Sequence, residues 1–88
     1  MTEALERLLT IAQTDTGQGK IVANFILAWW NATEFGGFDL ADLTNVDRSI
    51  REDMLEIIGY LASLSAVEYP TAYRGAIEKI VRMWRVAA

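Results

Sequence analysis

The chain contains no cysteine and no histidine in its 88 residues. These absences exclude disulfides, thiolate nucleophiles and imidazole bases, and they remove the usual protein ligands of zinc, copper and haem. The hydroxyl side chains are left without an obvious activating base, and Lys20 and Lys79 are the only lysine amines that could replace one. The sequence therefore predicts a protein that is not an enzyme and that holds no metal or other cofactor.

A long hydrophobic run is also missing. The longest apolar stretch, residues 21–30, is interrupted by Asn24 and is far shorter than the roughly 20 residues that span a bilayer. The first residues lack the basic start and the apolar segment of a secretory signal. We therefore expect a cytoplasmic protein that does not use a membrane.

Apolar residues nevertheless make up 52% of the chain, which suffices for one hydrophobic core in a chain of this length. Their spacing follows the helical period and nowhere alternates for long enough to form a strand. The clearest periodic signal is a row with steps of three or four residues: Val46, Ile50, Met54, Ile57, Leu61 and Leu64. The prediction is a single all-α domain, residues 1–88, built as a compact bundle of four helices plus a short helical turn: residues 2–13, 18–33, 40–43, 45–64 and 70–85.

Capping residues predict where several of these helices begin. Thr2 and Asp39 stand where a side chain can accept from the first N–H groups of a helix. Thr44, with Asp47 three residues later, resembles a capping box. Pro70 suits the first turn of the last helix, because its missing N–H is not needed there.

Charge is unevenly distributed along the chain. The formal net charge is −4, which disfavours direct binding to the phosphates of nucleic acid. Residues 34–56 carry seven acidic side chains against two arginines, whereas residues 69–88 carry four basic side chains against Glu78. We expect a polarised molecule in which some charges pair along one helix at a spacing of four residues: Arg48 with Glu52, Asp47 with Arg51, and Glu78 with Arg82.

Aromatic residues beside the acidic stretch indicate a binding surface. Trp29 and Trp30 are adjacent, so on a helix they point about 100° apart and cannot both enter the same part of a core. An exposed Trp30 with nearby phenylalanines would form an aromatic anchor of the kind that supplies much of an interface's binding energy. The candidate partner-binding residues are three aromatics and six carboxylates: Trp30, Phe35, Phe38, Asp39, Asp42, Asp47, Glu52, Asp53 and Glu56. The alternative is that the aromatics belong to the core and the carboxylates to a solvated face.

Two ligand sites fit the sequence less well. The segment 16–20, Thr-Gly-Gln-Gly-Lys, lacks the first glycine and the final serine or threonine of a phosphate-binding loop, so we expect an interhelical turn. Two groups of carboxylates could offer oxygen ligands to Mg²⁺ or Ca²⁺, although neither has the spacing of an EF-hand: Asp39 with Asp42, and Glu52 with Asp53 and Glu56.

Four short segments resemble a family of small proteins of unknown function from proteobacterial plasmids, integrative elements and phages: Phe-Ile-Leu-Ala-Trp-Trp-Asn-Ala at 25–32, Gly-Gly-Phe-Asp-Leu at 36–40, Asp-Met at 53–54 and Met-Trp-Arg at 83–85. The resemblance extends over about residues 15–85 and carries no activity with it. It implies a genetic setting, since mobile elements and phages encode many compact acidic proteins that block host defences, among them anti-CRISPR proteins.

The sequence therefore favours a small acidic binding protein whose partner is a protein or nucleoprotein complex, with inhibition of a host defence complex as the specific hypothesis. One alternative is a structural or regulatory module that self-associates, for example as a homodimer, through the aromatic patch. Another is a small DNA-binding regulator in which basic residues of the last helix contact nucleic acid: Arg74, Lys79, Arg82 and Arg85.

Overall fold

The computed structural model describes residues 1–86 and shows an all-α protein, as the spacing of the apolar residues predicts. No strand occurs among these residues. Four α-helices and two short 3₁₀ helices follow one another along the chain: α1 (Thr2–Ala12), α2 (Gly17–Phe35), η1 (Leu40–Asn45), α3 (Arg48–Ala62), η2 (Thr71–Tyr73) and α4 (Arg74–Trp84). Within residues 1–86, no helix combines the length and the apolar character needed to cross a membrane.

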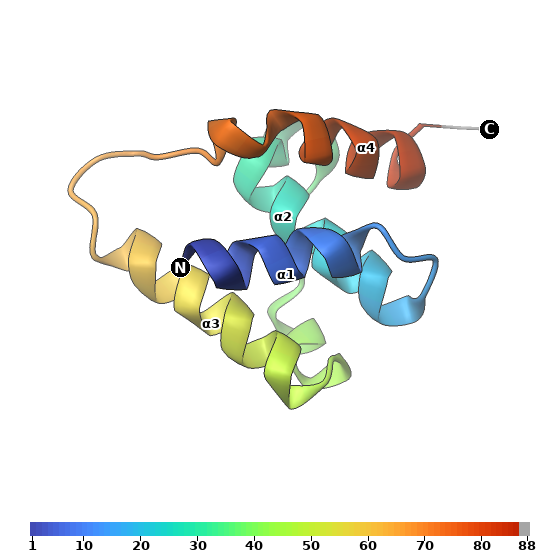
Figure 1. Ribbon diagram of the computed structural model, residues 1–88, viewed down its shortest axis with the longest axis horizontal. Coiled ribbons are helices and arrows are strands. Elements are labelled where there is room, and N and C mark those ends of the chain that lie inside the picture. Colours follow the sequence, from blue (N-terminus) through green and yellow to red (C-terminus); the bar gives the residue numbers. More distant parts are fainter. Residues whose placement is uncertain (87–88) are drawn as a thin grey trace.

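Helix α1 lies at the centre of the bundle. Figure 1 shows α4 on one side of α1 and α3 on the other, with α2 crossing behind α1. Helix α1 packs against all three other α-helices, and α2 packs against α4 as well. Residues far apart in the sequence therefore meet, as where Trp84 Nε1 donates to the backbone oxygen of Ala12 at 2.7 Å. Helices α3 and α4 present their outer surfaces on opposite sides of the molecule.

The core is apolar: no polar or charged side chain is buried in the described part of the chain. Burying one aliphatic side chain completely stabilises the fold by about 1.5–3 kcal/mol. All four α-helices contribute such side chains: Leu5, Leu8, Val22, Ile26, Leu27, Met54, Ile57, Ile77 and Ile80. This core, rather than the surface charges, holds the helices together.

The periodic row predicted for the third helix is confirmed over most of its length. Its first four members, Val46, Ile50, Met54 and Ile57, are buried. Leu61 and Leu64 are only half-buried, because beyond Ile57 the row lies under the connection between α3 and η2 and lines an open groove there. The buried face of α3 is therefore narrower at its C-terminal end than the spacing predicts.

Two of the predicted caps are wrong. Thr2 is already the first residue of α1, and Met1 occupies the N-cap position. Thr44 does not begin a helix, because its hydroxyl donates to the backbone oxygen of Ala41 at 2.8 Å. Helix α3 starts only at Arg48, after the backbone N–H of Asp47 has donated to Gln18 Oε1 of α2 at 2.6 Å. A side chain from another helix therefore takes the place of the local capping box.

Of the other two predicted helix starts, one is confirmed and the other lies at a different residue. Asp39 caps η1 as predicted, since its carboxylate accepts from the N–H of Ala41 at 3.0 Å. Pro70 is buried and precedes η2 rather than opening α4, which begins at Arg74. The last helix is therefore shorter than its apolar spacing indicates.

Helix α2 is broken near its end. Asn31 has extended backbone angles, φ −166° and ψ 83°, inside the helix. Its side-chain oxygen accepts from the N–H of Glu34 at 3.2 Å, so Asn31 acts as the cap of one last turn. Gly36, with φ 96°, then ends that turn in the left-handed region that favours glycine. This break sets the direction in which the chain leaves Trp30 and reaches Phe38.

Candidate functional site

Three of the six candidate carboxylates have a local structural role. Asp39 caps η1. Asp42 accepts from the side-chain amide of Asn45 at 3.0 Å. Asp47 accepts from the side-chain amide of Gln18 at 3.3 Å, which completes the reciprocal contact between α2 and the start of α3. Capping and turn formation therefore account for these three acids without a partner.

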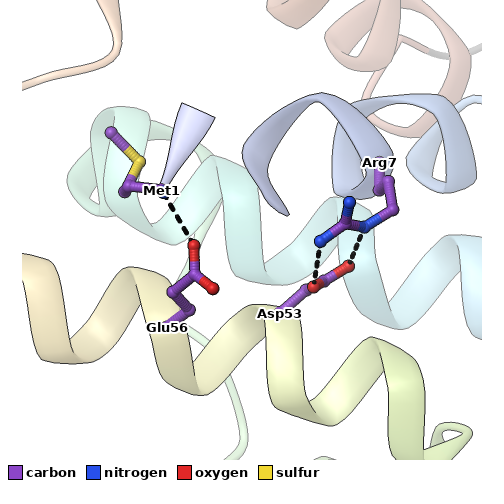
Figure 2. A network of polar contacts seen from close by, with 4 residues as sticks. All are labelled: Met1, Arg7, Asp53 and Glu56. Atoms are coloured by element: carbon purple, nitrogen blue, oxygen red, sulfur yellow. Dashed lines mark hydrogen bonds and ion pairs between the residues drawn. The ribbon is translucent and has the colours of Figure 1, made fainter. Parts of the chain in front are cut away.

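Two further carboxylates of α3 point towards α1, as Figure 2 shows. Asp53 accepts from Arg7 twice, from Nε at 2.9 Å and from Nη2 at 2.8 Å. This hydrogen bond raises the pKa of the Arg7 guanidinium. Glu56 pairs with the amino group of Met1 at 2.7 Å. Both acids join α3 to α1, and they are better explained by this junction than by a separate binding site.

These are the two ion pairs found in the part of the chain that the structure describes. The three pairs expected along single helices do not form there. For Arg51 the reason is visible, because its Nη2 donates to the backbone oxygen of Val46 at 3.3 Å instead of meeting Asp47. The charges that were expected to neutralise one another along α3 and α4 thus stay available for other contacts: Arg48, Glu52, Glu78 and Arg82.

The outward side of α3 combines charge with exposed apolar area. Glu52 is exposed and belongs to neither ion pair. Leu55 is 51% and Ile58 38% exposed, and both lie outside the buried row of the same helix. We call Arg48, Glu52, Leu55 and Ile58 the α3 outer face. The sequence contains a signal for it, since Leu55 and Ile58 are three residues apart and off the main apolar row.

The aromatic candidates do not lie on this face. Trp30 and Phe35 are half-buried and line a groove of about 310 Å³ between α2 and α4. The guanidinium of Arg74 lies 5.0 Å from the centre of the Trp30 ring, a cation–π contact. Phe38 packs edge-on against Phe25, with ring centres 5.3 Å apart. The structure therefore separates the aromatic candidates from the acids of α3, although they are close in sequence.

Neither tryptophan of the adjacent pair is fully exposed. Trp29 is half-buried, and its Nε1 donates to the backbone oxygen of Glu68 at 2.9 Å. The carboxylate of Glu68 accepts from the hydroxyl of Tyr60 at 2.6 Å, and this hydrogen bond raises the pKa of Tyr60. Glu68 thus fastens the connection between α3 and η2. Beneath that connection lies an open groove of about 450 Å³ whose lining includes Trp29, Leu61, Leu64, Val67 and Tyr69.

Four of the eight basic residues of the chain lie in α4 or directly after it, on the opposite side of α1 from α3. Arg74, Glu78 and Arg82 are exposed at four-residue steps along α4, and all three border the groove that holds Trp30. We call these three residues the α4 rim. Because α3 and α4 flank α1 on opposite sides (Figure 1), the acids of α3 are separated in space from Arg74 and Arg82.

The carboxylates do not converge on a common point. Within residues 1–86 no three carboxylates stand close enough together to hold a metal ion. The acids of η1 and α3 are instead spread along the surface, each with its own neighbours.

The fold and this surface define a small all-α protein with two chemically different outer helices. The chain belongs to a family of unknown function, DUF7673, whose family model matches residues 2–85. The match begins well before residue 15, where the resemblance seen in the sequence starts. No curated protein and no solved structure matches the chain.

Proposed function

We propose that the protein is a small, non-enzymatic binding protein that holds a partner protein or nucleoprotein complex through the α3 outer face. The observation that carries the proposal is the exposure of Leu55 and Ile58 beside Glu52, on a helix that lies at the edge of the bundle in Figure 1. The lack of histidine and cysteine in the whole chain supports a role in binding rather than in catalysis.

The two kinds of side chain on this face have different roles in recognition. Apolar side chains at helical spacing are the anchors with which a helix enters a groove on another protein. Charged residues beside such anchors steer the encounter and select a partner of opposite charge. Glu52 therefore favours a basic group on the partner, and Arg48 favours an acidic one.

Some of the partner-binding residues predicted from the sequence belong to the α3 outer face, and others do not. Glu52 stays, because it is exposed on α3 and belongs to neither ion pair within residues 1–86. Leu55 and Ile58 replace the aromatic residues that the sequence predicts as anchors, since Trp30 and Phe35 lie beside α4. The other carboxylates contribute negative potential around the face while serving their local structural contacts.

The specific form that we propose is a protein encoded by a mobile genetic element that inhibits a host defence complex, as anti-CRISPR proteins do. The resemblance to proteins of plasmids, integrative elements and phages supports this setting. Complexes that handle nucleic acid carry lysine and arginine where they bind phosphates. A protein of net charge −4 that presents Glu52 beside two apolar anchors can compete for such a surface.

The test is affinity capture of the tagged protein from a bacterial lysate that contains host defence complexes, with washes at low and then high salt. The variant Glu52→Lys with Leu55→Lys changes one charged and one apolar position of the face. The matched control, Asp15→Lys with Met83→Lys, makes the same two kinds of substitution at exposed positions outside α3.

We expect the wild type and the control to retain the same host complex, and the α3 variant to lose it. High salt should weaken the capture, because exposed charges are screened. Retention of the complex by the α3 variant at the wild-type level, measured by quantitative mass spectrometry, would show that this face is not the binding surface.

A further inference from the structure

Two outer surfaces of the molecule carry charged side chains that belong to neither of the ion pairs within residues 1–86. On the α3 outer face these are Arg48 and Glu52. On the α4 rim they are Arg74, Glu78 and Arg82. Because α3 and α4 flank α1 on opposite sides (Figure 1), the two sets cannot meet inside one molecule.

The order of the charges makes the two surfaces complementary. Residues four apart on a helix are neighbours on its surface, about 5–6 Å apart at Cβ. On α3, the positive charge of Arg48 is followed four residues later by the negative charge of Glu52. On the α4 rim, the negative charge of Glu78 has a positive charge four residues away on each side, from Arg74 and Arg82. With Arg48 placed opposite Glu78, Glu52 therefore meets Arg74 or Arg82, whichever way the helices run.

The apolar parts of the surfaces fit in the same way. Leu55 and Ile58 project from the α3 outer face with 51% and 38% of their area exposed. The α4 rim borders a groove of about 310 Å³ whose lining includes Trp30 and Val81. The lining of this groove is mixed, with the apolar side chains of Trp30, Phe35 and Val81 beside polar ones that include Glu34. Aliphatic anchors on one helix and apolar side chains in a groove are the elements used when an amphipathic helix docks on a protein.

We propose that a second copy of this chain docks its α3 outer face onto the α4 rim and the groove beside it. The charge order is compatible with this contact, and the groove beside the α4 rim favours it over pairing of the α3 outer face with itself. Antiparallel self-pairing of two α3 helices would also place Arg48 opposite Glu52, but it would leave the groove empty.

This contact joins two different surfaces, so it does not close by two-fold symmetry. Each copy that uses its α3 outer face still offers an α4 rim, and the assembly grows as an open chain or closes as a ring. It also covers the face that we assign to a partner, so partner and second copy compete for α3. The inference stands without the partner, because it depends only on contacts between copies of the chain.

The experiment uses two complementary variants and measures mass by sedimentation at low salt over a range of concentrations. Glu52→Lys with Leu55→Lys removes the α3 outer face, and Arg74→Ala with Arg82→Ala removes the α4 rim. We expect the wild-type mass to rise beyond that of a dimer with concentration and to fall at high salt. Each variant alone should associate at least about tenfold more weakly.

Mixing the two variants is the decisive step. Each supplies the surface that the other lacks, so the mixture should form a one-to-one complex that stops at two chains. The inference is wrong if the wild type has the mass of one chain at every concentration, if the α4 variant associates as the wild type does, or if the mixture forms no complex. Circular dichroism checks that each variant is folded, and Arg74→Gln with Arg82→Gln replaces an α4 variant that is not.

The same variants separate this inference from the proposed function. Arg74→Ala with Arg82→Ala leaves the α3 outer face intact, so capture of a host complex should persist in it while self-association is lost. Loss of capture in this variant would count against the proposed binding face and would leave the mass measurements unaffected.

Discussion

Helices α3 and α4 both pack on α1, but different polar contacts accompany the two packed faces. On α3, the buried side chains of Met54 and Ile57 are supplemented by ion pairs, in which Asp53 and Glu56 meet groups at the N-terminal end of the chain. The charges of these pairs are partly exposed, with the Arg7 side chain 56% accessible. Pairs of this kind add little stability in water, typically 0.2–1 kcal/mol.

On α4, the polar contacts reach the backbone of other helices. Beside the buried Ile77 and Ile80, Trp84 donates to the backbone oxygen of Ala12. Arg85, which follows α4, donates to the backbone oxygen of Phe35 at 3.0 Å. These contacts lie in half-buried surroundings, where salt screens them less. Two helices packed on one apolar core can thus differ in their polar contacts, and we expect the contacts of α3 to be more sensitive to salt than those of α4.

The largest effects should be equal on the two helices, because the apolar core is common to both. Met54→Ala on α3 and Ile77→Ala on α4 each remove a fully buried side chain. We expect each to lower the free energy of unfolding by about 2–5 kcal/mol in chemical denaturation. The exposed Leu55→Ala is the control and should stay within about 0.5 kcal/mol of the wild type. A loss on one helix only would mean that the other helix is not part of the cooperative core.

Helices α3 and α4 can be compared only if the packing of α1 against α2 stays the same. Gly19 tests this packing, because α2 approaches the end of α1 closely at that residue. A Cβ atom at this position would lie 2.7 Å from Thr14 Oγ1 and 2.9 Å from the backbone oxygen of Ile11. Gly19→Ala should therefore destabilise the fold by about 1–3 kcal/mol. Gly17→Ala, where a Cβ meets nothing within 4 Å, is the matched control and should be nearly neutral. Equal stability of the two variants in thermal unfolding would contradict this close approach.

A smaller loss of stability than in the core is expected when the hydrogen bond between α4 and α1 is removed. Trp84→Phe keeps an aromatic ring but removes the N–H that donates to Ala12. Leaving a part-buried acceptor without its donor costs about 1–3 kcal/mol. The loss should be the same at low and high salt, measured by urea unfolding. A loss that disappears at high salt would remove the distinction between the two junctions.

The smallest loss of stability is expected when an ion pair between α3 and α1 is removed. Asp53→Asn removes the charge that pairs with Arg7 and should cost about 0.2–1 kcal/mol at low salt, with less at high salt. Glu52→Gln on the same helix is the control, because Glu52 belongs to neither ion pair within residues 1–86. If both variants unfold at the same urea concentration at low salt, the Arg7 pair contributes nothing measurable.

The fold could be predicted because the information that specifies its helices is local. The row from Val46 to Ile57 has the helical period, and the same four residues are buried. The first residue of a helix was harder to predict where a residue distant in the sequence makes a hydrogen bond to that helix start. The Asp47 N–H at the start of α3 donates to Gln18 of α2, 29 residues earlier in the chain, and nothing near Thr44 reveals that contact.

The candidate site was harder to predict because periodicity defines faces without saying what covers them. Trp30 and the acids of α3 are close in sequence, yet Trp30 meets Arg74 of α4. Asp53 has the spacing of a surface acid, yet it pairs with Arg7, 46 residues away. Leu55 and Ile58 were missed because their exposure follows from the position of α3 at the edge of the bundle, which only the packing of the helices determines.

The contact between Trp84 and Ala12 has a consequence for how the chain comes to be folded during synthesis. The residues that cover the C-terminal end of α1 are translated 72 positions after it. Until α4 has left the ribosome, the apolar sides of α1 and α2 that face it have no cover, and such surfaces make a nascent chain prone to aggregation. Covering of these apolar sides by α4 should therefore lower the tendency of the nascent chain to aggregate.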